Sequence, residues 1–76
     1  MPPNTFCHDT LIELAPFSHN DAWVRGAHAV CDMYAGADAV QFEGILRRLA
    51  VGSSGSALTL GATWLLKRWQ VAQLSQ

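Results

Sequence analysis

Five side chains in the first 31 residues are of the types that bind zinc or act as nucleophiles and bases: Cys7, His8, His19, His28 and Cys31. Zinc accepts thiolate and imidazole ligands, and His28 and Cys31 have the i, i+3 spacing that places two side chains on one face of a helix. The sequence contains no C-x-x-C pair, which is the usual knuckle of such a site. We therefore expect no metal ion, and a site on Cys7, His28 and Cys31 stays an open alternative.

Cys31, His28 and Asp32 are also the residue types of a nucleophile, a base and an orienting acid. On a helix, His28 and Asp32 share one face, whereas Cys31 points to the apolar side. Because no loop offers an evident oxyanion hole, we expect no catalytic residues and no enzyme. The N-terminal residues lack the basic and long apolar segments of a secretory signal, which predicts a cytoplasmic protein with reduced Cys7 and Cys31 thiols.

Two patterns could bind anions, and simpler interpretations account for both. The Gly52–Ser56 loop precedes a predicted helix but lacks the lysine of a phosphate-binding loop. Arg47, Arg48, Lys67 and Arg68 lie near the C-terminal ends of predicted helices, where cations are stabilised by the helix dipole. The net charge of −1 supplies little attraction to phosphate. We expect no nucleic acid, no small-molecule substrate and no cofactor.

The segment from Leu49 to Leu66 contains 18 residues without a charge, which is long enough for a membrane span to be considered. Eight of these 18 residues are Gly, Ser or Thr, and they gather in a turn-like cluster. This distribution favours a hairpin of two helices over a span, and leaves a single-pass membrane peptide as an alternative.

An N-terminal arm is predicted to precede the helices. Residues 1–9 are expected to be extended, and a short helical turn over Leu11–Ala15 is expected to end at Pro16. The predicted organisation is therefore an arm over residues 1–17 and a single helical domain over residues 18–76.

The first of three predicted helices follows Ser18, which forms with Asp21 an approximate capping box. Gly36 is its expected stop signal. Its apolar side chains fall on one stripe, as in a helix that lies on a core: Trp23, Ala27, Val30, Cys31 and Tyr34.

Asp38 is expected to cap the second helix, which ends at Gly52. Ser54 or Ser56 is expected to cap the third helix, from about Ala57 to Leu74. The second helix carries its large apolar residues on one face: Phe42, Ile45, Leu46 and Leu49.

The third helix has apolar residues on two nearly opposite sides. One stripe can face the other helices: Leu58, Ala62, Leu65, Leu66, Trp69 and Ala72. Hydrophobic residues make up 50% of the chain and charged residues 14%, so 76 residues cannot bury every apolar side chain in one small core. The second stripe is therefore a predicted partner surface, to which Tyr34 and Phe42 are added: Leu60, Trp64, Val71 and Leu74.

Several short runs carry a resemblance to a known family. These are Leu11–Ala15, Gly26-Ala27 leading to Cys31 and Tyr34, Asp38–Phe42, and Leu49 followed by Gly52 and Ala57-Leu58. With these runs the segment Leu11–Gly61 resembles the small tetratricopeptide-type (TPR-type) chaperones of type III secretion needle subunits. In a tetratricopeptide unit, the small residue at the Ala57 position lets two helices approach each other. Gly61 departs from the repeat, which usually has a large aromatic residue there.

The resemblance implies a cytosolic virulence protein that joins a small helical co-chaperone and holds the needle subunit in a non-polymerised state. The fold expected is all-α, a three-helix, TPR-like hairpin with a short N-terminal arm. The alternative is a self-associating small helical regulator or phage-type inhibitor, in which the same stripe forms a symmetric dimer interface.

Overall fold

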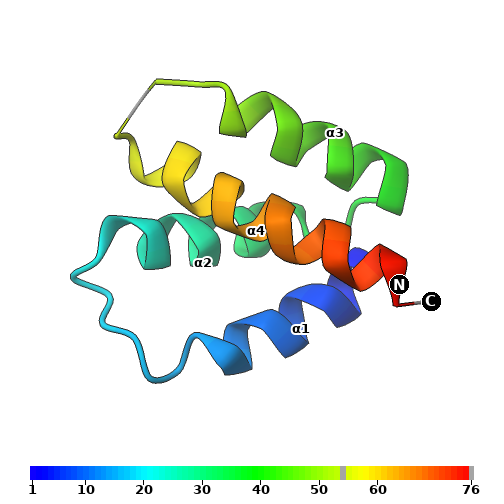
Figure 1. The fold of residues 1–76 in the computed structure, drawn as a ribbon, viewed down its shortest axis with the longest axis horizontal. Helices are drawn as coiled ribbons and strands as arrows, with labels where there is room; N and C mark the ends of the chain where they lie inside the picture. Colours follow the sequence, from blue (N-terminus) through cyan, green and yellow to red (C-terminus); the bar gives the residue numbers. More distant parts are fainter. Residues whose placement is uncertain (54, 76) are drawn as a thin grey trace.

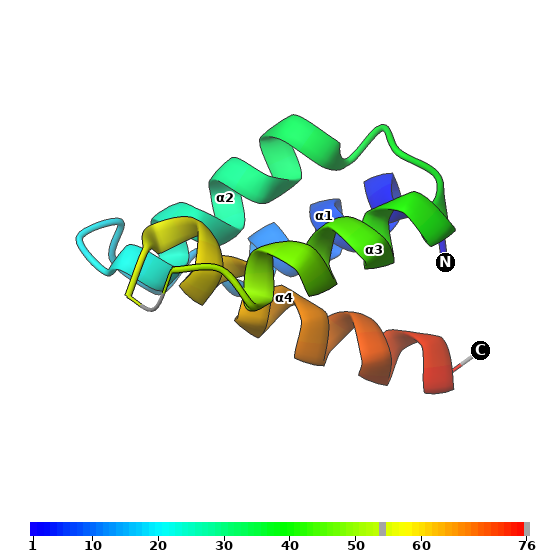
Figure 2. The same cartoon turned by 90° about the horizontal axis from the view of Figure 1, so that it is seen from above.

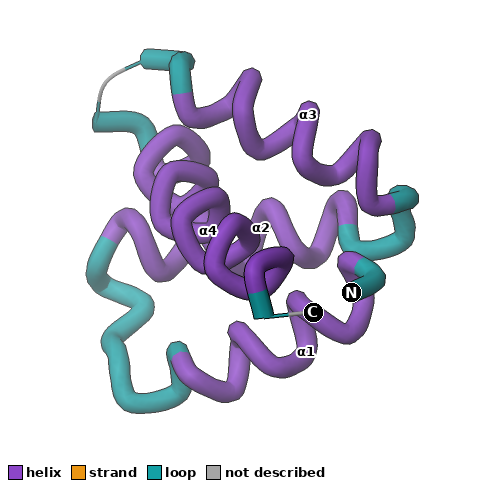
Figure 3. Tube along the Cα trace, turned by 45° about the vertical axis from the view of Figure 1, so that its right-hand side comes forward, coloured by secondary structure: helices purple, strands orange, loops and turns teal. Residues whose placement is uncertain are grey.

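The computed structural model describes residues 1–53 and 55–75, and these residues form helices joined by loops, with no strand among them (Figure 3). The helices are α1 (Pro3–Glu13), α2 (Ala22–Tyr34), α3 (Ala39–Ala50) and α4 (Ala57–Leu74). Successive helices run in alternating directions, and α4 lies in front of the others (Figure 1). The all-α class is confirmed. The described part of the chain has four helices, so the expected count of three is wrong.

The additional helix is α1, where an extended arm was expected. Pro3 occupies its first helical position, which suits proline because its fixed φ matches a helix and its missing N–H has no helical partner there. Phe6, Thr10 and Leu14 recur every four residues and are buried. The predicted turn over Leu11–Ala15 is therefore the end of a longer helix, and α1 contributes to the same core as the other helices.

The helix α2 begins four residues later than Ser18. The Ser18 hydroxyl accepts a hydrogen bond from the Asn20 N–H at 3.0 Å and so belongs to the preceding loop. Arg25 of α2 holds that loop, because its Nη1 donates to the carbonyl oxygens of His19 and Asn20, each at 2.8 Å. The core side of α2 carries Val24, Ala27, Val30 and Cys31.

The caps of α3 and α4 are as predicted. The Asp38 carboxylate accepts from the Gln41 N–H at 2.8 Å, and the Ser56 hydroxyl accepts from the Thr59 N–H at 3.1 Å. Each bond satisfies one of the free N–H groups of a helical first turn. The other predicted cap, Ser54, lies outside the described residues. The bounds of α4 agree with the expected Ala57 to Leu74.

α2 and α4 touch near their first turns and diverge toward their ends (Figure 2). A Cβ at Gly26 would overlap the Ala57 carbonyl, and a Cβ at Gly61 would overlap the backbone of Gly26 and Ala27. The two backbones are therefore in direct contact, which only glycine permits. This packing explains Gly61 at a position where the resembled repeat has a large aromatic residue.

Three aromatic rings from α1, α3 and α4 pack together in the core. Phe6 of α1 lies edge-on to Phe42 and Trp69, with ring centroids 5.9 and 5.1 Å apart, and Phe42 lies 5.1 Å from Trp69. The Trp69 indole N–H donates to the Glu43 carboxylate at 3.1 Å, which satisfies the polar atom of a buried ring. α1, α3 and α4 are joined through this cluster.

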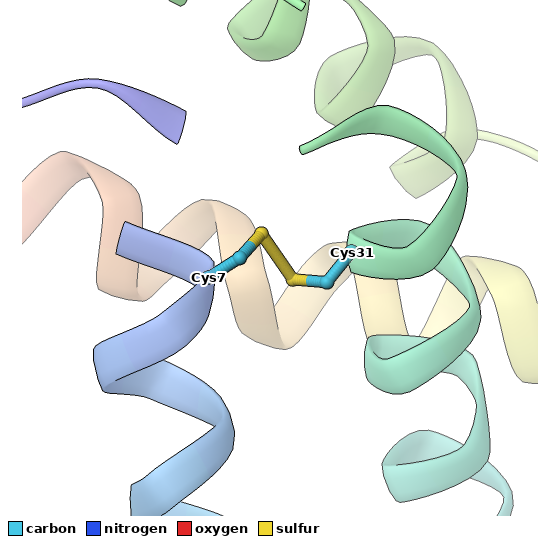
Figure 4. The surroundings of a disulfide bond; sticks show 2 residues. All are labelled: Cys7 and Cys31. Atoms are coloured by element: carbon cyan, nitrogen blue, oxygen red, sulfur yellow. A yellow bond between two sulfur atoms is a disulfide. The ribbon is translucent and has the colours of Figure 1, made fainter. Parts of the chain in front are cut away.

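Cys7 of α1 and Cys31 of α2 form a disulfide, with Cα atoms 5.7 Å apart (Figure 4). The expectation of reduced thiols is therefore wrong. Both cysteines are buried. The helical face of Cys7 could not be known while residues 1–9 were taken as extended, and the pairing depends on how α1 packs against α2.

The four helices leave the chain as compact as an ordinary monomer of its size. Its accessible surface is 4519 Å², and a compact monomer of 8.3 kDa exposes roughly 4,600 Å². The chain therefore exposes about as much surface as an ordinary monomer of its mass.

Candidate partner-binding surface

α4 has a core side and an outer side. Ala62, Leu65 and Trp69 on the core side are at most 2% exposed. Leu60, Val71 and Leu74 on the opposite side are 39, 60 and 86% exposed. We call Leu60, Trp64, Val71 and Leu74 the outer row; it was expected from the sequence as an apolar stripe on the side of α4 opposite Leu65 and Trp69.

Trp64 is the most firmly held member of the outer row. It is half-buried, its ring lies 5.3 Å from that of Trp23, and Trp23 lies 5.2 Å from Phe17. The Arg68 guanidinium sits 5.1 Å from the centroid of the Trp64 ring, within the range of a cation–π contact. A large aromatic ring held in one position loses little conformational entropy when a partner covers it.

A shallow groove of about 260 Å³ runs between α1 and α4 beside Val71. The Arg68 guanidinium and the Glu13 carboxylate, 3.8 Å apart, face each other across it. Both apolar and charged residues line it, and they include Met1, Phe6, Asp9, Glu13, Arg68 and Val71. The groove therefore adjoins the outer row at Val71.

Phe42 does not belong to a surface, because its side chain is fully buried between Phe6 and Trp69. Its inclusion among the partner residues is wrong, since α1 covers the side of α3 that an extended arm would have left open. Tyr34 ends α2, where it packs half-buried against the core. That end of α2 lies away from α4 (Figure 2), so Tyr34 is not brought together with the outer row.

The cysteine and histidine side chains form neither the zinc site nor the catalytic group that the sequence analysis considered. Cys7 and Cys31 are joined to each other, so neither thiol is free as a nucleophile or a zinc ligand. The His28 ring lies beside the His19 ring, with centroids 4.4 Å apart. Within residues 1–53 and 55–75, no group of three or more His, Cys, Asp or Glu side chains is placed to hold a metal ion.

Two of the four cations in the C-terminal half are near acids. The Arg47 guanidinium lies 3.8 Å from the Glu43 carboxylate one turn earlier on α3, and Arg68 lies at the same distance from Glu13 of α1. Such exposed pairs contribute little to stability, but they reduce the positive charge available to a nucleic acid.

No helix in the described part of the chain combines the length and the apolar character that crossing a membrane requires. A scan of protein-family profiles, a search of curated proteins and a search of solved structures each found no match to this chain.

Proposed function

We propose that the chain is a protein-binding helical module that holds an amphipathic helix of another protein against the outer row of α4. One observation carries this proposal: the outer row is apolar although the opposite side of the same helix already closes the core. A helix with apolar residues on both sides is normally covered on both sides. Large apolar side chains that stay exposed along one side of a helix can mark an interaction site.

The mode of binding that fits this surface is a helix lying along a row of anchors. Such partners present apolar residues at i, i+3, i+4 and i+7 spacing, and the outer row has matching intervals along α4. Trp64 and the adjacent Arg68 are the residue types enriched in interface hot spots. We expect Trp64 to be the central anchor, with Leu60, Val71 and Leu74 extending the contact.

The more specific form of this proposal is a chaperone of a type III secretion needle subunit, acting together with a small helical co-chaperone. It rests on the resemblance over Leu11–Gly61, with α3 and α4 as the TPR-like pair. The chaperone would keep the needle subunit from polymerising by covering its amphipathic helix.

The Cys7–Cys31 disulfide is in tension with the cytoplasmic location that this chaperone requires, because disulfides are rare in a reducing cytosol. The binding proposal itself does not depend on the compartment. The disulfide joins α1 to α2, whereas the outer row is on α4.

Co-expression with small helical proteins encoded beside this chain tests the proposal. We expect a defined hetero-complex on size exclusion with light scattering, lost in Val71→Asp/Leu74→Asp. The matched control is Val40→Asp/Val51→Asp, since these valines are 85 and 84% exposed and lie outside the row. A complex that survives the first variant, or a chain that forms no complex with any such protein, would contradict the proposal.

A further inference from the structure

The outer row has a cation at its centre. Lys67 follows Trp64 by three residues and precedes Val71 by four, so the three side chains lie on the same side of α4. α4 carries Lys67 and Arg68 and no acidic residue. Arg68 already faces Trp64 and Glu13. Among the residues described, Lys67 is exposed and takes part in no ion pair. Along α4 the outer row therefore has one cationic side chain, Lys67, between two groups of apolar side chains.

We propose that the partner helix carries a carboxylate side chain between two apolar clusters, so that this carboxylate meets Lys67. This inference rests on the function proposed above. A helix that covered Trp64 and Val71 would remove water from Lys67 between them, and a desolvated ammonium group is costly unless an anion pairs with it. From Leu60 to Leu74 the row spans roughly 20 Å, which sets the length of the contacting segment.

A second copy of this chain fits the same row poorly. The anchors are spaced almost symmetrically about residues 67 and 68, so two α4 helices could pair antiparallel with Trp64 of one copy against Val71 of the other. That arrangement would bring the Lys67 side chains of both copies close together near the symmetry axis. Like charges in contact disfavour an interface, and α4 supplies no acid to offset them.

An anionic lipid surface is also a poor fit, although it too would attract Lys67. Asp9 and Glu13 of α1 line the groove beside Val71. A broad negative plane would meet these two carboxylates together with the lysine. A single helix, about 10 Å wide, can follow α4 and contact Lys67 without covering α1.

The test uses the intact oxidised chain and two synthetic amphipathic helices of about 20 residues, a length at which isolated helices form. The two peptides share the same leucine anchors and differ only in two central residues on the apolar side, which are Glu in one and Lys in the other. Their affinity is measured by fluorescence anisotropy at low and high salt. We expect the Glu peptide to bind about tenfold more tightly at low salt, with a smaller difference at high salt.

Lys67→Glu should reverse this preference, whereas Arg48→Glu, the same charge change at an exposed position on α3, should leave it unchanged. If both peptides bind equally well and Val71→Asp/Leu74→Asp abolishes this binding, the inference of an acidic partner is wrong, whereas the proposed helix-binding function is supported. Binding of neither peptide would count against both. If the chain binds phosphatidylserine vesicles and shows no preference between the peptides, the occupant of the outer row is a membrane and not an acidic helix. If the chain forms a dimer at low salt that Val71→Asp/Leu74→Asp dissociates, the occupant is a second copy of the chain.

Discussion

Gly26 of α2 and Gly61 of α4 bring the backbones of their helices into direct contact, and a Cβ on either glycine would overlap main-chain atoms of the facing helix. Main-chain atoms cannot turn aside as the end of a flexible side chain can. The contact therefore sets where α4 lies along α2. It also determines which side of α4 faces the core and which side carries the outer row.

Gly61→Ala is expected to lower the free energy of unfolding by about 2 to 3 kcal/mol, because the added methyl group pushes α4 away from α2. Gly44→Ala is the matched control. Gly44 also lies inside a helix, but a Cβ there meets no described atom within 4 Å, so alanine should stabilise the chain by up to about 1 kcal/mol. Urea unfolding monitored by circular dichroism measures both. Equal effects of the two substitutions would contradict the backbone contact.

Reduction of the Cys7–Cys31 disulfide is expected to cost about 3 kcal/mol of stability, because the bond closes a loop between residues 24 apart in sequence. The measurement is urea unfolding with and without a phosphine reductant. Cys7→Ala/Cys31→Ala is the control and should not respond to the reductant. An unfolding midpoint of the natural chain that reductant leaves unchanged would show that the two cysteines are not paired.

Phe42→Ala is expected to destabilise the chain by about 3 to 5 kcal/mol, because the ring is fully buried against Phe6 and Trp69. Leu74→Ala should change stability by no more than about 0.5 kcal/mol, since 86% of Leu74 is exposed. Thermal and urea unfolding of the two variants compare a core residue with a member of the outer row. A loss of stability below about 1 kcal/mol in Phe42→Ala would contradict the burial of Phe42 and make it a candidate surface residue again.

The parts of the fold that the sequence predicts correctly depend on local signals. Asp38 and Ser56 are capping residues whose hydrogen bonds reach only three positions along the chain. The two apolar sides of α4 follow from helical periodicity alone, which places Leu65 and Trp69 opposite Leu60 and Val71. Such features need no knowledge of how distant segments meet.

The parts that sequence reasoning missed depend on tertiary packing. Pro2 and Pro3 suggest an extended start, yet proline is also favoured at a helix N-terminus. The signal for α1 in the sequence was the recurrence of Phe6, Thr10 and Leu14 at intervals of four residues. Once α1 is a helix, Cys7 reaches Cys31 and Phe6 covers Phe42. One missed helix therefore accounts for the errors in helix count and in the assignment of Phe42. The reduced thiols were instead predicted from the lack of a secretory signal, which says nothing about how Cys7 and Cys31 are placed.

The most direct test of the outer row as a binding surface uses the indole N–H signals of the three tryptophans in a nitrogen-15 NMR titration with a helical partner isolated by co-expression. Trp64 lies in the outer row, Trp23 contacts it, and Trp69 is buried on the core side. We predict that the Trp64 signal shifts most, the Trp23 signal shifts less, and the Trp69 signal keeps its position. A partner that shifts Trp69 and leaves Trp64 unchanged would contradict binding through the outer row.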